Sequence, residues 1–284
     1  MEYVELANGI QMPQLGYGVF QIDDTEAQRC VGNALKAGYR LIDTAQAYGN
    51  ERGVGAAVAE SGIARDELFV VSKVWVSEYG EGRTYDSIRR SLDLLGLEQI
   101  DLMLLHQAYN DYHAAWRDME RAYDDGLVRA IGVSNFDPMR LIDLCTFSRV
   151  APMVNQIETH AFWQQRAAHA NMEQLGVAHM GWGPFAEGAN GFFENPLLAE
   201  IAAKHGKSVG QVALRYQLDQ GVIVIPKTVR AERMAENFDV FDFALDDDDR
   251  EKIAELDCGR SLCFDHTDAQ LIGGLLKMVK GQIG

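Results

Sequence analysis

Four side chains that can donate, accept or relay a proton stand at the ends of three consecutive apolar segments. Asp43 lies at the end of the first of these segments and Tyr48 just after it, Lys73 comes at the end of the second, and His106 ends the third. Groups of these types carry out general acid–base chemistry. Each has a simpler explanation alone: Asp43 as a helix cap, Lys73 as a solvated charge and His106 as a hydrogen-bonded core residue. Their shared position favours a joint role.

Short apolar segments alternate with helical patterns along the whole chain, which predicts a parallel sheet covered by helices. Some segments, such as 100–105, are almost uninterrupted, as expected for strands buried on both faces. The predicted strands are 15–20, 41–45, 68–74, 100–106, 128–134, 153–158, 177–182 and 222–226. The predicted helices are 24–37, 50–61, 84–95, 112–125, 138–147, 164–175 and 195–220, and an eighth begins near Arg230.

Eight such repeats in 284 residues predict an α/β fold of the closed (β/α)8 TIM-barrel class, as one domain over 1–284. A dinucleotide site on an open doubly wound sheet would use a GxGxxG turn after the first strand, whereas Gly53-Val54-Gly55 runs on as Ala56-Ala57-Val58 inside a helical pattern. The strands therefore place their polar carboxyl ends, and any chemistry, at one mouth of a barrel.

The two ends of the chain are expected to close the barrel. Asn8-Gly9 lies between short strand-like runs and predicts an N-terminal hairpin across the bottom. The acidic run 246–249 is expected to begin a C-terminal helix, where its charge complements the helix dipole, with metal binding as the alternative. The tail 259–284 shows no strong periodicity, and we expect it to lie near the active-site mouth.

The bulk composition excludes several classes of partner. A net charge of −16 argues against nucleic acid, because such a chain repels phosphate backbones. No apolar run is long enough to cross a bilayer, and the N-terminus carries no secretory signal. The cysteines have no CxxC spacing, as expected for reduced thiols. We therefore expect a cytoplasmic protein with no membrane partner.

Five motifs in combination resemble the aldo-keto reductases, in particular the bacterial members similar to 2,5-diketo-gluconate reductases. The motifs are Asp-Thr-Ala-Gln-Ala-Tyr-Gly-Asn-Glu at 43–51, Ser-Lys-Val-Trp at 72–75, Leu-Leu-His at 104–106, Gly-Val-Ser-Asn-Phe at 132–136 and Ile-Pro-Lys-Thr at 225–228. The resemblance extends from the hairpin to about Asp257. It implies a barrel, NADPH as hydride donor, no metal, and an aldehyde, ketone or keto-sugar substrate. It also implies a monomer, with a homodimer as the alternative.

The resemblance assigns a role to each proton-handling side chain. Tyr48 is expected to donate a proton to the carbonyl oxygen, and Lys73 to make it a better acid by lowering its pKa from about 10. Asp43 is expected to hold Lys73, and His106 to orient the carbonyl. The expected walls of the substrate pocket are Phe20, Tyr48, Trp75, His106 and Tyr109.

The resemblance also places the cofactor across the mouth. The expected contacts near the nicotinamide are Gly18, Val19, Phe20, Asp43, Ser134, Asn135, Gln156 and the stacking residue Trp182. The diphosphate is expected over Gly183, Phe185 and Glu187, the 2′-phosphate at Lys227, Thr228, Val229 and Arg233, and the adenine at Glu236 and Asn237.

Three cations support NADPH over NADH independently of the resemblance. Lys227, Arg230 and Arg233 lie within seven residues of a chain whose net charge is −16. Cations at the start of a helix interact unfavourably with its dipole, and a bound anion would offset this interaction. A 2′-phosphate is a suitable counterion.

The sequence departs from the family pattern in places. Gln107-Ala108 follows His106 where many members have Trp-Pro, and Gly183 stands where serine is common. The segment 188–195 is short and offers little material for a loop that clamps the cofactor.

Other functions fit the sequence less well. A non-catalytic cofactor-binding subunit or sensor would not need all four proton-handling residues. A lyase or isomerase with Lys73 as a Schiff-base amine would need that amine uncharged, whereas Asp43 would keep it charged. A zinc hydrolase using His106, His160 and His179 would show a spacing such as HExxH, which is absent from the sequence.

Overall fold

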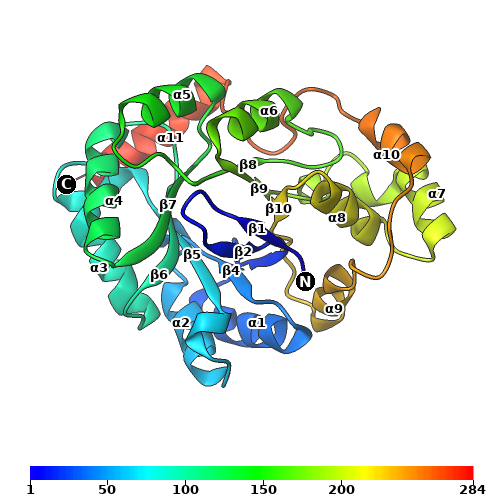
Figure 1. The fold of residues 1–284 in the computed structure, drawn as a ribbon, viewed down its shortest axis with the longest axis horizontal. Helices are drawn as coiled ribbons and strands as arrows, with labels where there is room; N and C mark the ends of the chain where they lie inside the picture. The colour runs from blue at the N-terminus through cyan, green and yellow to red at the C-terminus, as the bar shows by residue number, and fades with distance from the viewer. Residues whose placement is uncertain (284) are drawn as a thin grey trace.

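Eight parallel strands form the centre of the computed structural model, which describes residues 1–283 (Figure 1). Each strand pairs with the next one along the chain. Leu15 also pairs with Val224, and the amide of Gly18 donates to the carbonyl of Pro226 at 3.2 Å, so the first and last strands meet. The predicted barrel is confirmed. Its strands are β3 (Gly16–Gly18), β4 (Leu41–Asp43), β5 (Phe69–Val74), β6 (Ile100–Leu105), β7 (Val128–Ser134), β8 (Val154–Glu158), β9 (Ala178–Trp182) and β10 (Ile223–Val224).

Helices surround the strands, as the alternating pattern predicts. The prediction of one helix over 195–220 is wrong, because Gly206 adopts φ 63° and ends the first half. Ser208 then begins a second helix through a capping box with Gln211. The helices are α1 (Asp24–Ala37), α2 (Glu51–Glu60), α3 (Arg83–Leu95), α4 (Tyr112–Asp124), α5 (Pro138–Phe147), α6 (Arg166–Leu175), α7 (Pro196–His205), α8 (Val209–Asp219), α9 (Ala231–Phe238), α10 (Asp247–Ala254) and α11 (Ala269–Gln282).

Alternation along each strand divides the core into two parts. On β5, Phe69 and Val71 belong to an inner cluster, whereas Val70 packs in the cluster that includes helix residues. On β6, Leu102 and Leu104 belong to the inner cluster in the same way. Because side chains two residues apart point to the same side, positions 73 and 106 continue the inner rows at the carboxyl ends of their strands.

The N-terminal hairpin closes one end of the barrel, as predicted. It consists of β1 (Tyr3–Glu5) and β2 (Gln11–Pro13), and its turn contains Gly9 at φ 82°. Figure 1 shows the hairpin lying across the end of the barrel. Leu6 and Met12 are buried and join the inner cluster. This end is therefore filled with apolar side chains.

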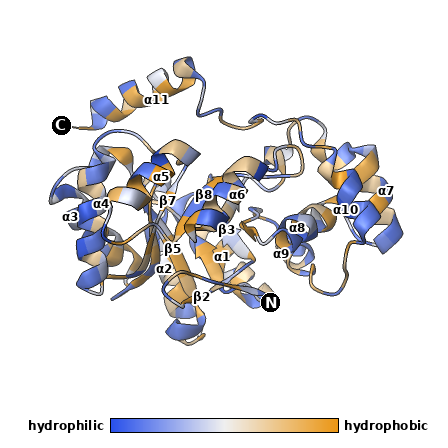
Figure 2. Ribbon diagram, turned by 45° about the horizontal axis from the view of Figure 1, so that its top comes forward, coloured by the Kyte–Doolittle hydropathy of each residue, from blue (hydrophilic) through white to orange (hydrophobic). Residues whose placement is uncertain are grey.

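The C-terminal region contains more regular structure than its sequence suggests. Asp246 caps α10, so the acidic run begins a helix as expected. The aperiodic tail, however, contains α11, whose start Asp268 caps by accepting hydrogen bonds from two backbone amides. Gly273 and Gly274 interrupt the pattern in sequence, which hides this helix. Figure 2 shows α11 joined to α10 by a long segment that runs across the top of the view. Within residues 1–283, no helix has the length and apolarity to cross a membrane.

Candidate active site

Lys73 is the centre of a buried polar cluster at the barrel mouth. Its Nζ donates to Asp43 Oδ1 at 2.6 Å, to the Thr44 carbonyl at 3.0 Å and to the Tyr48 hydroxyl at 3.3 Å. The side chain of Lys73 is fully buried and that of Asp43 is 2% exposed. Tyr48 is half-buried and comes from the short 3-10 helix η1 (Gln46–Tyr48) that follows β4. Three of the four expected side chains are therefore in direct contact.

His106 completes the group. Its ring lies edge-on to Tyr48, with centroids 5.7 Å apart, and edge-on to Trp75 at 5.1 Å. Its backbone is held by Val74 and by the Asn135 side chain, which donates to the His106 carbonyl at 3.1 Å. Among the residues that the structure describes, no partner is present for His106 Nδ1. The four side chains thus meet at the carboxyl ends of three neighbouring strands.

The environment fixes the protonation states of the group. Burial raises the pKa of Tyr48, and the nearby ammonium of Lys73 lowers it by a smaller amount. Burial lowers the pKa of Lys73, but Asp43 and Tyr48 outweigh it and the net shift is upward. Burial, followed by the charge of Lys73, holds the pKa of His106 well below its ordinary value. At neutral pH the mouth therefore holds a phenol, an ammonium and a neutral imidazole.

Burial adds a contribution to the pKa of Tyr48 that no sequence pattern indicates. Lys73 acts in the predicted direction, but the net shift of the phenol is upward rather than downward. The sequence could not show this, because the depth at which the hydroxyl lies depends on the packing of separate loops. A raised pKa keeps the phenol protonated.

Five of the residues expected near the nicotinamide form one hydrogen-bonded network. Trp182 Nε1 donates to Asn135 Oδ1 at 2.9 Å, and Asn135 Nδ2 donates to Ser134 Oγ at 3.1 Å. Ser134 Oγ donates to the Gln156 carbonyl at 2.9 Å, and Gln156 Nε2 donates to Asp43 Oδ2 at 2.8 Å. The structure therefore links these polar residues to the proton-handling group.

The first-strand residues differ from one another in what they can contact. The side chain of Val19 is fully buried in the core, so a ligand at this position could contact only its backbone. A Cβ at Gly18 would lie 3.1 Å from the Ile225 carbonyl, so the close approach of the strands explains this glycine. Phe20 is 46% exposed, and its ring centroid lies 5.0 Å from that of Tyr48.

Residues after β9 form the edge of the mouth. Gly183 adopts φ 64° and Glu187 adopts φ 53°, so the chain turns sharply over this segment. The ring of Phe185 packs against those of Phe192 and Phe193, with centroids 6.0 Å and 5.4 Å apart. Side-chain packing thus holds the segment to which the family resemblance assigns the diphosphate.

The cations after β10 face solvent. Lys227, Arg230 and Arg233 are exposed, and none of them forms an ion pair within residues 1–283. The guanidinium of Arg233 lies 5.9 Å from the ring centroid of Phe193. Exposed cations without acidic partners fit a phosphate group.

The remaining expected contacts near these cations differ in exposure. Val229 is exposed, and the carbonyl of Thr228 accepts from the Tyr17 hydroxyl at 2.5 Å. On α9, Glu236 is exposed and Asn237 is buried. Both residues lie one to two turns into the helix whose start carries the cations.

The pocket wall includes residues that the sequence did not identify. Tyr109 donates from its hydroxyl to the carbonyl of His266 at 3.3 Å, and His266 Nε2 lies 3.0 Å from Gln107 Oε1. Trp75 Nε1 donates to Gln282 Oε1 at 2.9 Å. The tail thus contacts the expected substrate walls. Gln107 was visible as a departure beside His106, but no sequence signal pointed to His266.

Known proteins share this architecture. The model of the aldo/keto reductase family matches residues 6–257. The chain is 44% identical to the glyoxal reductase of Bacillus subtilis over 89% of this chain and 92% of the relative. It is 41% identical to the methylglyoxal reductase DkgA of Escherichia coli over 91% and 94%. It is 43% identical to the 9,11-endoperoxide prostaglandin H2 reductase of Trypanosoma cruzi over 89% and 90%.

Solved structures agree. An aldo/keto reductase from Brucella melitensis superposes with a TM-score of 0.87 at 43% identity, over 90% of this chain and 99% of that one. An aldo-keto reductase of Bombyx mori in complex with NADP gives 0.89 at 33% identity, over 94% and 96%. The chain therefore belongs to the aldo/keto reductase family and is an NADP-dependent oxidoreductase.

Proposed function

We propose that the chain reduces small aldehydes and ketones to alcohols and that Tyr48 donates the proton. The observation that carries the proposal is the contact chain from Tyr48 through Lys73 to Asp43, beside a neutral His106. A phenol with a raised pKa is protonated at neutral pH and so has a proton to give. The adjacent ammonium stabilises the phenolate that remains afterwards.

Each residue of the group then has a distinct task. When bound beside this group, NADPH would supply the hydride that the carbonyl carbon accepts. As negative charge develops on the carbonyl oxygen, Tyr48 transfers its hydroxyl proton to that oxygen. Lys73 keeps its charge because Asp43 accepts from it, and the neutral imidazole of His106 donates a hydrogen bond that orients the carbonyl.

The cofactor contacts follow the network at the mouth. The amides of Asn135 and Gln156, with Ser134, would bind the nicotinamide carboxamide, and Trp182 would stack on the ring. The segment 183–187 would carry the diphosphate, as barrels commonly bind phosphate after the last strands. Lys227 and Arg233 would bind the 2′-phosphate, for which their exposure without acidic partners is the support.

The substrate class follows from the relatives and the pocket. Two relatives are named as reductases of glyoxal and of methylglyoxal, which are small 1,2-dicarbonyl compounds. The pocket wall combines the aromatic rings of Trp75 and Tyr109 with the polar side chains of Gln107 and His266. We therefore propose 2-oxoaldehydes as substrates, since such molecules carry a second polar oxygen next to the reacting carbonyl.

Replacing Tyr48 tests the proposal directly. Tyr48→Phe removes the hydroxyl and should lower the rate of methylglyoxal reduction on the order of 10²–10⁴-fold, the usual worth of a proton donor. NADPH binding, measured by fluorescence titration, should stay within about twofold, because the ring is retained. Tyr85→Phe removes a surface hydroxyl that donates to Asp125 and serves as the matched control. Wild-type turnover in Tyr48→Phe would refute the assignment.

Other expectations stay predictions. These are one barrel domain over 1–284, a monomeric state, a cytoplasmic location and the absence of a nucleic-acid partner. The net charge of −16 supports the last of these, and the four cysteines, all of them free thiols, agree with a reducing compartment.

A further inference from the structure

The tail between α10 and α11 crosses the mouth and touches several strand ends. Ser261 contacts Glu158 at the end of β8, and the Cys263 sulfur lies 3.7 Å from the position that a Cβ at Gly183 would take. Farther along, His266 reaches Gln107 after β6. These contacts show that the segment 261–266 spans the opening from the side of β8 and β9 to that of β6.

Glu158 holds this segment with an unusual number of hydrogen bonds. Its carboxylate is buried and accepts from Ser261 Oγ at 2.7 Å and from His160 Nε2 at 3.1 Å. It also accepts from three consecutive backbone amides, those of Leu262 at 2.9 Å, Cys263 at 3.1 Å and Phe264 at 3.3 Å. Consecutive N–H groups that converge in this way form an anion-binding nest. Here the bound anion is a side chain of the barrel itself.

The carboxylate is an ion at every physiological pH. Burial by itself would raise the pKa of Glu158, but the hydrogen bonds from His160, Ser261 and the backbone lower it to about 2. The tautomer of His160 is fixed, because Nδ1 accepts from the amide of Trp163 at 3.1 Å and Nε2 therefore carries the proton. Four of the five donors come from the tail. Because the acceptor is an ionised carboxylate, these hydrogen bonds are charge-assisted, and together they hold the tail in a specific position.

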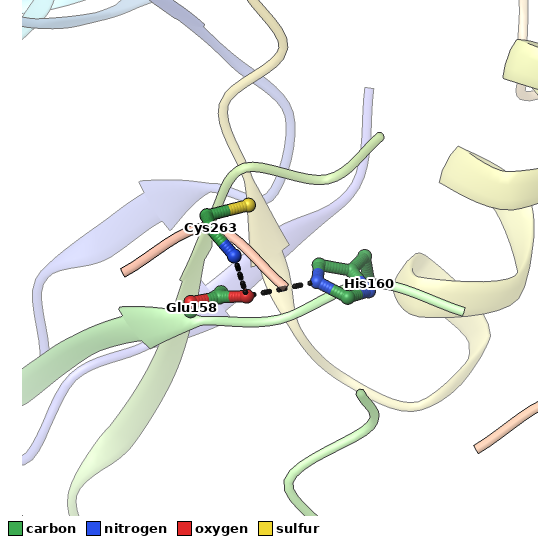
Figure 3. Close-up of side chains that lie close together, drawn as sticks. All are labelled: Glu158, His160 and Cys263. Atoms are coloured by element: carbon green, nitrogen blue, oxygen red, sulfur yellow. Dashed lines mark hydrogen bonds and ion pairs between the residues drawn. The ribbon is translucent and has the colours of Figure 1, made fainter. Parts of the chain in front are cut away.

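A metal site is the other role that these residues suggest. Figure 3 shows the carboxylate of Glu158, the ring of His160 and the thiol of Cys263 close together, as ligands would be. However, both carboxylate oxygens already accept hydrogen bonds, and burial raises the pKa of the Cys263 thiol, which disfavours a thiolate ligand. The contacts favour an anchor.

We propose that residues 261–266 form a strap that closes over the bound dinucleotide beside Gly183, and that Glu158 is the positioning residue that holds it closed. This inference rests on the proposed function, which places the diphosphate on 183–187. The segment 188–195 after β9 is short and leaves little chain for a clamp. The tail lies where such a clamp is needed, since Cys263 is near both Gly183 and Glu187.

The strap makes a kinetic prediction. The cofactor can leave only when the strap opens. The strength of the hydrogen bonds between the strap and Glu158 therefore limits the rate at which NADPH dissociates. Glu158→Gln replaces an acceptor oxygen by an NH2 group that faces N–H donors. We expect NADPH to dissociate about tenfold faster, which corresponds to the loss of one charged hydrogen bond. Ser261→Ala removes a single donor on the tail and should give a smaller increase, about threefold.

Stopped-flow tryptophan fluorescence during a chase with excess NADP+ measures the dissociation rate of NADPH. The matched control is Thr267→Ala, a tail hydroxyl that donates only to Asp265, and it should release NADPH at the wild-type rate. Circular dichroism checks that each variant is folded. Ser261→Ala keeps the test valid if Glu158→Gln is unstable, since Ser261 is only partly buried.

The outcomes separate the strap from the proposed function. Faster release in both variants, with the control unchanged, supports the strap. If the wild type binds NADPH and reduces carbonyls but both variants release it at the wild-type rate, the strap is overturned and the proposed function stands. A rise in carbonyl KM alone would also overturn it, since the tail would then shape only the substrate pocket. A wild type that fails to bind NADPH would instead refute the proposed function.

Discussion

Each end of the barrel buries an aspartate against cations, and the two sites differ in what the cations touch. At the hairpin end, Asp101 on β6 accepts from Arg65 at 2.6 Å and from Arg129 at 2.7 Å. The two arginine side chains are 36% and 37% exposed, and Asp101 is fully buried. At the mouth, Asp43 meets Lys73, whose side chain is fully buried.

The difference lies in the remaining partners. Asp101 also accepts from the amide of Val70, so every donor to its carboxylate is an arginine side chain or a backbone amide. Lys73 instead extends the charge pair to the hydroxyl of Tyr48, which can lose its proton. The same kind of pair thus stabilises the fold at one end and prepares an acid at the other. Mutations at the two ends should separate stability from turnover.

The largest effect is expected at the mouth. Lys73→Met removes the ammonium that stabilises the phenolate and should lower turnover on the order of 10²–10⁴-fold. It also leaves Asp43 buried without its cation, at a cost of about 3–5 kcal/mol in unfolding free energy. NADPH consumption with methylglyoxal and urea denaturation measure the two effects.

The double variant Asp43→Asn with Lys73→Met separates them. It removes both charges, so much of the lost stability should return while turnover stays low. If turnover recovered together with stability, Lys73 would act by holding the fold, and the contrast between the two ends would disappear.

A smaller effect, on stability alone, is expected at the hairpin end. Asp101→Asn leaves two arginines without their shared carboxylate and should lower the unfolding free energy by about 3 kcal/mol. Because these arginines are partly exposed, water offsets some of the loss. Turnover per folded molecule should remain within about twofold, as measured with methylglyoxal below the unfolding temperature. A large loss of turnover with unchanged stability would contradict this division.

Strand alternation explains why much of the site could be predicted from sequence. Asp43, Lys73, His106, Gln156 and Trp182 all lie at carboxyl ends of strands, at positions in step with inward apolar residues such as Leu41, Val71, Leu104, Val154 and Met180. The same rule reaches Glu158, two residues beyond Gln156, so its inward position could also be predicted from sequence. Period two therefore carries most of the information about which polar residues face the mouth.

The strap could not be predicted in the same way. Ser261, Leu262, Cys263 and Phe264 have no periodicity, and their partner, Glu158, lies more than 100 residues earlier in the chain. The raised pKa of Tyr48 was hidden for a related reason, since burial results from loops that pack only in the folded chain. Long-range contacts made by irregular segments leave no local pattern.

The smallest effect is expected at a cation that is exposed and has no acidic partner in the described chain. Arg233 is exposed and without an acidic partner in the described chain, unlike both Arg65 and Lys73, so its removal should leave stability unchanged. We expect Arg233→Ala to weaken NADPH binding about tenfold, the worth of one charge-assisted hydrogen bond to phosphate, and to leave NADH binding unchanged. Fluorescence titration with both cofactors measures this. Arg117→Ala, an exposed arginine on α4, is the control. Equal losses of affinity for NADPH and NADH would mean that Arg233 does not contact the 2′-phosphate. A bound phosphate would then not explain why Arg233 has no acidic partner in the described chain.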